Sequence, residues 1–86
     1  MRVVIAMPEA KSMDIHEAGL SMNLAELIFE TRAGADMTQA ELATALGTSQ
    51  SAVAEWESGA QVPQVDVLDR LAQVCGKRLH ISIDPE

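Results

Sequence analysis

The feature that most constrains this chain is the run from Thr38 to Pro63, TQAELATALGTSQSAVAEWESGAQVP. It holds two short stretches of helix-forming residues, 39–46 and 50–58, and a glycine follows each of them. Glycine accepts the left-handed backbone that ends a helix and permits a sharp turn. The run therefore predicts two short helices that are joined by a tight turn at Gly47.

Capping residues support both helix starts. Thr38 and Glu41 have the spacing of a capping box, in which each side chain bonds to the backbone N–H of the other residue. Thr48 or Ser49 is expected to cap the second helix, because a hydroxyl can accept one of the free amide protons of the first turn.

Two further helices flank this run. Asn23 and Glu26 form another capping box, which predicts a helix that starts after Asn23 and ends where Gly34 takes a left-handed conformation. Apolar residues at helical spacing predict a last helix over about Gln64–Cys75, and Gly76 ends it.

Apolar residues at helical spacing identify the expected core. This core is mainly aliphatic, because the chain has only one Trp and one Phe. A chain of 86 residues forms one small domain with a modest core. The side chains expected to point inward are Leu24, Leu27, Ile28 and Thr31, then Leu42, Ala45 and Leu46, then Val53 and Trp56, and finally Val65, Leu68, Leu71, Ala72 and Cys75.

Both ends of the chain predict short strands. Val3–Met7 is β-branched and apolar up to Pro8, and LHISI at 79–83 alternates apolar with polar residues. Residues 9–19 have no clear period and receive no assignment. The expected organisation is an N-terminal strand and linker over 1–20, a helical domain over 21–76, and a C-terminal dimerisation strand over 77–86.

The charge distribution restricts the function. The formal net charge is −7, and no Lys or Arg stands between Arg32 and Arg70. Proteins that bind nucleic acids usually present a basic face, because phosphate neutralisation supplies much of the affinity. The composition therefore argues against strong non-specific DNA binding and suits a basic partner protein.

Several protein classes are not predicted. A single cysteine, Cys75, excludes an internal disulfide, and neither His16 nor His80 has neighbours that would make a metal site. Without a nucleophile–base pair we expect no enzyme, no metal and no other cofactor. The short apolar start and the absence of a run of roughly 20 apolar residues predict a soluble cytoplasmic protein with no membrane partner.

The motifs TQAELA, LGTSQSAV, WESG and LDRLAQVCG, in this order and spacing, resemble the lambda-repressor-like helix-turn-helix family, also called the Cro/C1 or XRE type. The resemblance covers about Leu24 to Gly76. It implies a mainly α fold in which a four-helix domain carries short N- and C-terminal β-strands. The second helix of the motif would then lie in the major groove of double-stranded DNA.

The segment LHISI is similar to the C-terminal strand of a sub-group of bacterial antitoxins in this family. In that sub-group the strands of two subunits pair across a dimer axis. The similarity implies a homodimer whose contact includes Leu79, Ile81 and Ile83. Val3–Met7, which has no obvious partner strand nearby in the sequence, is expected to join the same intersubunit sheet.

The family resemblance also assigns candidate DNA contacts. Gln39 is expected to contact a phosphate at the N-terminus of its helix, where the helix dipole favours an anion. Gln50 suits adenine, because its amide can donate to N7 and accept from N6. The other candidates are Thr48, Ser49, Ser51, Ala54 and Glu55. Of these, Ser49 is better explained as a helix cap, Ala54 offers only a methyl group, and Glu55 repels phosphate.

Arg32 and Glu57 match positions at which family members carry a partly buried ion pair, so both are predicted to support the fold. Three functions then remain open. The first is a dimeric, sequence-specific transcriptional regulator. The second is an antitoxin that binds a toxin, and the third is a phage or accessory protein whose motif binds another protein. The missing basic residues favour the last two, whereas Gln39 and Gln50 favour the first.

Overall fold

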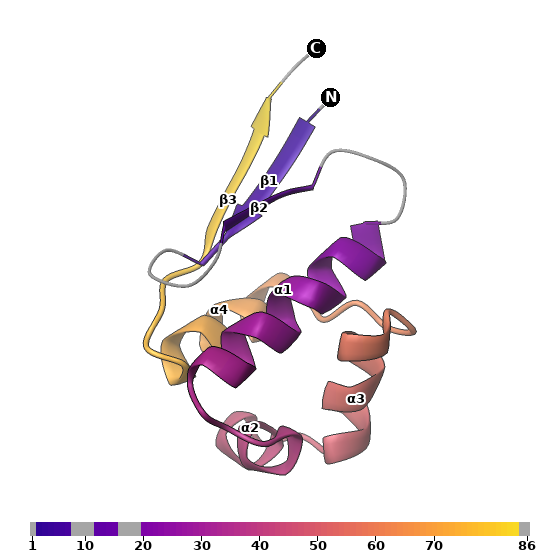
Figure 1. The fold of residues 1–86 in the computed structure, drawn as a ribbon, viewed down its shortest axis with the longest axis vertical. Coiled ribbons are helices and arrows are strands. Elements are labelled where there is room, and N and C mark those ends of the chain that lie inside the picture. Colours follow the sequence, from indigo (N-terminus) through magenta and orange to yellow (C-terminus); the bar gives the residue numbers. More distant parts are fainter. Residues whose placement is uncertain (1, 8–11, 16–19, 85–86) are drawn as a thin grey trace.

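Four helices and three strands follow one another in the computed structural model, which describes residues 2–7, 12–15 and 20–84. The helices form one body, and the sheet packs against it at one end and projects beyond it (Figure 1). This is the predicted mainly α fold with short terminal strands. In chain order the elements are β1 (Arg2–Ala6), β2 (Ser12–Ile15), α1 (Leu20–Gly34), α2 (Gln39–Leu46), α3 (Gln50–Ser58), α4 (Val65–Val74) and β3 (His80–Asp84).

Local capping sets the bounds of α2 and α3, and both predicted ranges are confirmed. The Glu41 N–H donates to Thr38 Oγ1 at 3.0 Å, and the Thr38 N–H donates to Glu41 Oε1 at 2.8 Å. Ser49 caps α3, because its Oγ accepts the N–H of Ala52 at 3.1 Å. Gly47 follows α2 with a φ of 71°, the left-handed conformation that the tight turn requires.

The predicted bounds of the first helix are wrong at both ends. α1 begins at Leu20, ahead of the expected cap at Asn23, so Asn23 lies inside the helix. Gly34 is the last helical residue, and the left-handed position with a φ of 58° falls on Asp36. The amides of Ala35 and Asp36 still bond to carbonyls three residues back, which tightens the chain for one more turn. Asp tolerates the left-handed region better than most residues, so no glycine is needed there.

The sheet is assembled from the two ends of the chain. Its strand order is β2-β1-β3, and both pairings are antiparallel, with Val3 paired to Ile15 on one side and Ile83 on the other. The unassigned stretch 9–19 therefore contains a strand, β2. The expectation that Val3–Met7 has no partner strand nearby in the sequence is wrong, because β1 pairs with β2 as well as with β3.

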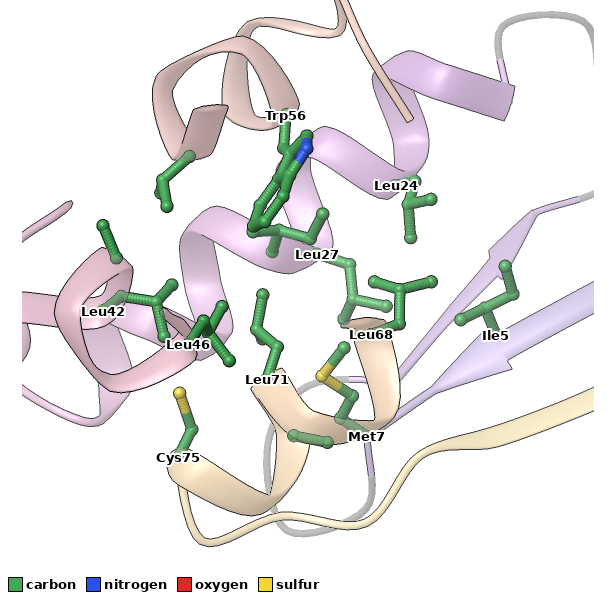
Figure 2. Packing of buried hydrophobic residues seen from close by; sticks show 14 residues of the cluster. Ile5, Met7, Leu24, Leu27, Leu42, Leu46, Trp56, Leu68, Leu71 and Cys75 are labelled. Atoms are coloured by element: carbon green, nitrogen blue, oxygen red, sulfur yellow. The ribbon is translucent and has the colours of Figure 1, made fainter. Parts of the chain in front are cut away.

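Helices and sheet share one core (Figure 2). Ile5 and Met7 enter it from the sheet, and the buried side chains of the helices are Leu24, Ala25, Leu27, Ile28, Thr31, Leu42, Ala43, Leu46, Val53, Trp56, Leu68, Leu71, Ala72 and Cys75. Burial raises the pKa of the Cys75 thiol.

Two predicted core residues are exposed. Ala43 of α2 is buried instead of Ala45, because the inward stripe of α2 is rotated by part of a turn. Val65, the first residue of α4, is 61% exposed. The other predicted inward residues are buried.

Candidate nucleic-acid interface

The helices α2 and α3 form the end of the molecule that lies far from the sheet (Figure 1). On α3, Val53 and Trp56 point into the core, while Gln50, Ser51 and Glu55 are exposed on the opposite side. A short helix that is anchored on one side and bare on the other is the geometry in which a recognition helix enters the major groove.

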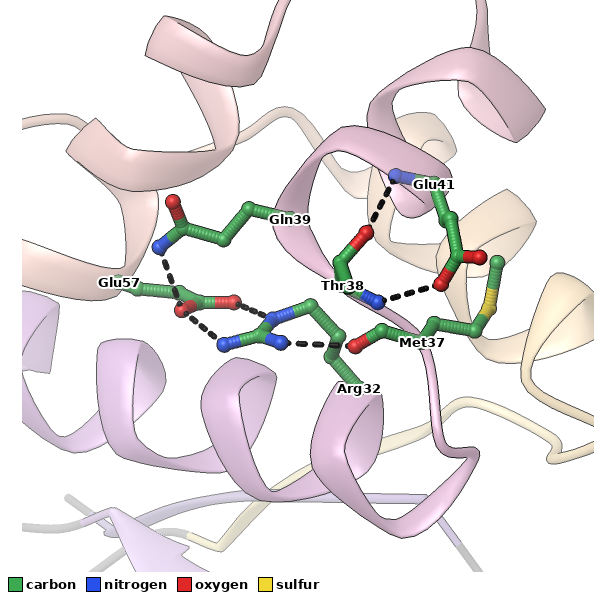
Figure 3. Close-up of polar contacts among 6 residues, drawn as sticks. All are labelled: Arg32, Met37, Thr38, Gln39, Glu41 and Glu57. Carbon is green, nitrogen blue, oxygen red and sulfur yellow. Dashed lines mark hydrogen bonds and ion pairs between the residues drawn. The ribbon is translucent and has the colours of Figure 1, made fainter.

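A buried polar cluster holds α3 from its inner side (Figure 3). Arg32 Nε lies 2.6 Å from Glu57 Oε2, and Arg32 Nη2 lies 2.9 Å from Glu57 Oε1. The two side chains are 13% and 7% exposed, so water screens this bidentate pair only weakly. The hydrogen bond to Glu57 raises the pKa of the Arg32 guanidinium, although burial opposes the shift.

Arg32 extends the cluster to two further groups. Its Nη1 donates to the Met37 carbonyl at 2.8 Å, which fixes the loop before α2. Its guanidinium carbon also lies 5.3 Å from the ring centroid of Phe29, within the range of a cation–π contact. Arg32 is thereby engaged in the fold, and the structure brings it together with Glu57 as the family resemblance implied.

Gln39, the predicted phosphate contact, is also bonded within the fold. Its side chain is half-buried, and Nε2 donates to Glu57 Oε1 at 3.1 Å (Figure 3). The residue that opens α2 is therefore tied to the last turn of α3.

The remaining candidate contacts divide into exposed and engaged groups. Thr48 is exposed in the turn, where its N–H donates to the Ala43 carbonyl at 2.9 Å. The Ser49 hydroxyl oxygen accepts the bond that caps α3. Ala54 is half-buried, which limits the methyl surface that it offers outward.

Arg70 is a supporting residue that sequence reasoning missed. Its Nη2 donates to the Leu46 carbonyl at 2.8 Å, so α4 supplies the cation at the C-terminus of α2. A positive charge there complements the helix dipole and satisfies an otherwise free carbonyl. The available signal was that the last turn of α2 contains no basic residue of its own.

Arg32 and Arg70, which lie on either side of α2 and α3 in the sequence, thus both make hydrogen bonds within the protein. Between them the sequence has only acidic charges. The outer side of α3 consequently offers amide and hydroxyl groups and the Glu55 carboxylate, but no cation.

The three residues proposed for a dimer contact occupy different environments. Leu79 is half-buried and packs on the core, whereas Ile81 and Ile83 are 39% and 60% exposed. They belong to β3 or precede it, and β3 is an edge strand of the sheet. An exposed apolar edge strand leaves backbone groups ready to pair with another strand.

The comparisons with known proteins agree with this geometry. A family model described as helix-turn-helix matches residues 28–81, from the middle of α1 into β3. The chain belongs to this XRE-type helix-turn-helix family, which is a family of DNA-binding domains.

One curated relative is the endothelial differentiation-related factor 1 homolog of Xenopus laevis, which is 25% identical over 71 residues. The match covers 83% of this chain and 48% of the relative, so the chain spans about half the length of that protein.

Within the described part of the chain, no helix is long and apolar enough to cross a membrane.

Proposed function

We propose that this protein is a sequence-specific transcriptional regulator, a repressor that binds double-stranded DNA through α3. Gln50 leads the readout, with Ser51, Ala54 and Glu55 facing the same groove. The observation that carries the proposal is that the two sides of α3 differ. Trp56 and Glu57 hold the helix to the fold on one side, and Gln50 and Ser51 are exposed on the other. We propose a cytoplasmic location for the protein.

The polar chemistry of the exposed side supports specificity more than affinity. The Gln50 amide can make two hydrogen bonds to adenine, and Glu55 can accept from the amino group of cytosine. Each phosphate contact that is missing removes about one unit from the slope of log affinity against log salt. We therefore expect weak, salt-insensitive binding to random DNA and a preference that depends on α3.

Selection of bound duplexes from a random DNA pool tests this proposal. The regulator account expects an enriched motif, and a Gln50→Ala variant should lose the enrichment at one or two base positions. If the folded protein enriches no motif in low salt, the proposal that it binds specific DNA is wrong.

We further propose that the regulator acts as a dimer in which β3, within residues 77–86, continues the sheet into a second copy. Support comes from the exposure of Ile81 and Ile83 on a strand that has β1 on one side and nothing described on the other. Two-fold pairing would set two α3 helices for half-sites that are about 34–36 Å apart.

Sedimentation of an Ile81→Lys variant tests the dimer, with Ser82→Lys as the matched control. The first change places a charge among the apolar residues of β3, whereas the second alters the polar side of the same strand. Ile81→Lys should be monomeric with its helices intact. A dimer of unchanged affinity in Ile81→Lys would contradict the β3 contact.

A second candidate function is an antitoxin or accessory module that binds a protein. The specific observation in its favour is that Arg32 and Arg70 are both bonded internally, so the α2–α3 end of the molecule presents no basic residue between them. Such a surface suits a basic protein partner better than a phosphate backbone. A gene for a small basic protein next to this one, together with failure of the DNA selection, would favour this alternative.

A further inference from the structure

We infer that Gln39 is a positioning residue, which fixes α3 against α2 by binding Glu57. The inference deepens the proposed function, and only its DNA-binding test rests on that function. Two observations support it, namely the orientation of the Gln39 carboxamide and the position of its bond to Glu57 on the two helices.

The orientation of the Gln39 side chain follows from its partner. A carboxylate only accepts hydrogen bonds, so the group that faces Glu57 Oε1 at 3.1 Å must be the amide nitrogen. The carbonyl oxygen of Gln39 then points away from the cluster (Figure 3). A phosphate also consists of acceptors, so the carbonyl oxygen cannot bond to it, and Nε2 has one N–H left beside the one that it donates to Glu57.

The bond between Gln39 and Glu57 joins the start of α2 to the end of α3. Gln39 is the first residue of α2 and Glu57 stands in the last turn of α3, while the turn at Gly47 joins the other two helix ends. The helices are thus connected at both ends, once through the chain and once through a side-chain bond. A connection at the open end limits how far α3 can rotate about the turn.

The partner of Gln39 is itself held firmly. Glu57 Oε1 accepts from both Arg32 Nη2 and Gln39 Nε2, and the Glu57 side chain is 7% exposed. Arg32 meanwhile bonds the Met37 carbonyl in the loop that leads to α2. Gln39 therefore connects α2 to a rigid group that already joins α1 and α3, and a charged acceptor makes this bond stronger than a neutral one.

A Gln39→Met variant keeps the length of the side chain and removes the bond. Gln73→Met is the matched control, because Gln73 also donates to a carboxylate, Asp69 Oδ2 at 3.1 Å, but within α4. Gln39→Lys restores a donor toward Glu57 and serves as the rescue. Circular dichroism and thermal melting establish that each variant is folded.

Hydrogen exchange of the free protein is the first readout. In Gln39→Met the amides of the last turn of α3 should lose protection about three- to tenfold, with less change in α4. Gln73→Met should show the reverse, and Gln39→Lys should restore the pattern. Unchanged protection in the last turn of α3 overturns the inference.

Binding to the selected duplex and to random duplex is the second readout. A positioning role expects Gln39→Met to weaken the selected duplex about tenfold and the random duplex less than about twofold. A direct phosphate contact expects equal losses on both, and that result overturns the inference. If the wild-type protein binds no duplex, the proposed function fails, while the hydrogen-exchange result still decides the role of Gln39.

Discussion

The two sides of α3 differ in how their polar groups are used. On the inner side, Glu57 accepts three hydrogen bonds from Arg32 and Gln39 and lies next to the buried Trp56. On the outer side, Gln50 and Glu55 are exposed. The inner side is committed to the fold, and the outer side is available for a ligand.

This difference implies that stability and recognition are separable in this protein. Changes on the inner side should lower the free energy of unfolding, and they should affect binding only indirectly, through that loss or through the position of α3. Changes on the outer side should leave stability within about 0.5 kcal/mol, as is usual for exposed positions without special contacts.

The largest expected effect comes from Trp56→Ala. Removing a buried aromatic side chain usually costs about 3–5 kcal/mol, because transfer energy is lost and a cavity remains. Denaturant unfolding should show this loss, whereas Ser51→Ala on the outer side of the same helix should change little. A cost below about 1 kcal/mol for Trp56→Ala would mean that the inner side is not the anchor of α3.

The next effect concerns the ion pair of Arg32 and Glu57. A double-mutant cycle with Arg32→Met and Glu57→Gln should give a coupling energy of about 2 kcal/mol in the free energy of unfolding, above the value for exposed pairs. The coupling should persist in high salt, because the pair is largely buried. A coupling near zero would show that solvent screens the pair.

A smaller effect is expected from Glu55→Lys on the outer side. The change replaces a charge that repels phosphate by one that attracts it, so random DNA should bind more tightly and with a steeper salt dependence. Glu26→Lys on α1 makes the same change in net charge away from α3 and serves as the control. Equal gains in both variants would mean that Glu55 does not face the DNA.

The helical part of the fold could be predicted because its determinants are local. Thr38 with Glu41, and Ser49 with its own first turn, specify the starts of α2 and α3 within a few residues of sequence. The first helix was less well predicted, since Gly34 offered a plausible end and the geometry at Asp36 depends on bonds to the preceding carbonyls.

The sheet could be predicted only in part, because its pairing joins residues far apart in the sequence. The alternation at 79–83 revealed β3, but nothing local showed that β1 would pair with it or that β2 would form at 12–15. At the candidate site, the resemblance brought Arg32 and Glu57 together. The bond of Gln39 to Glu57 and that of Arg70 to Leu46 depend on side-chain orientations that no sequence pattern encodes.

The central claim is that the outer side of α3 reads DNA sequence. The most direct measurement compares Gln50→Ala with wild type on the selected duplex, on random duplex and in denaturant unfolding, with Gln73→Ala on α4 as the control. We expect Gln50→Ala to lose about 1–3 kcal/mol on the selected duplex, little on random DNA, and nothing measurable in stability. Unchanged affinity for the selected duplex, or an equal loss on both duplexes, would contradict the claim.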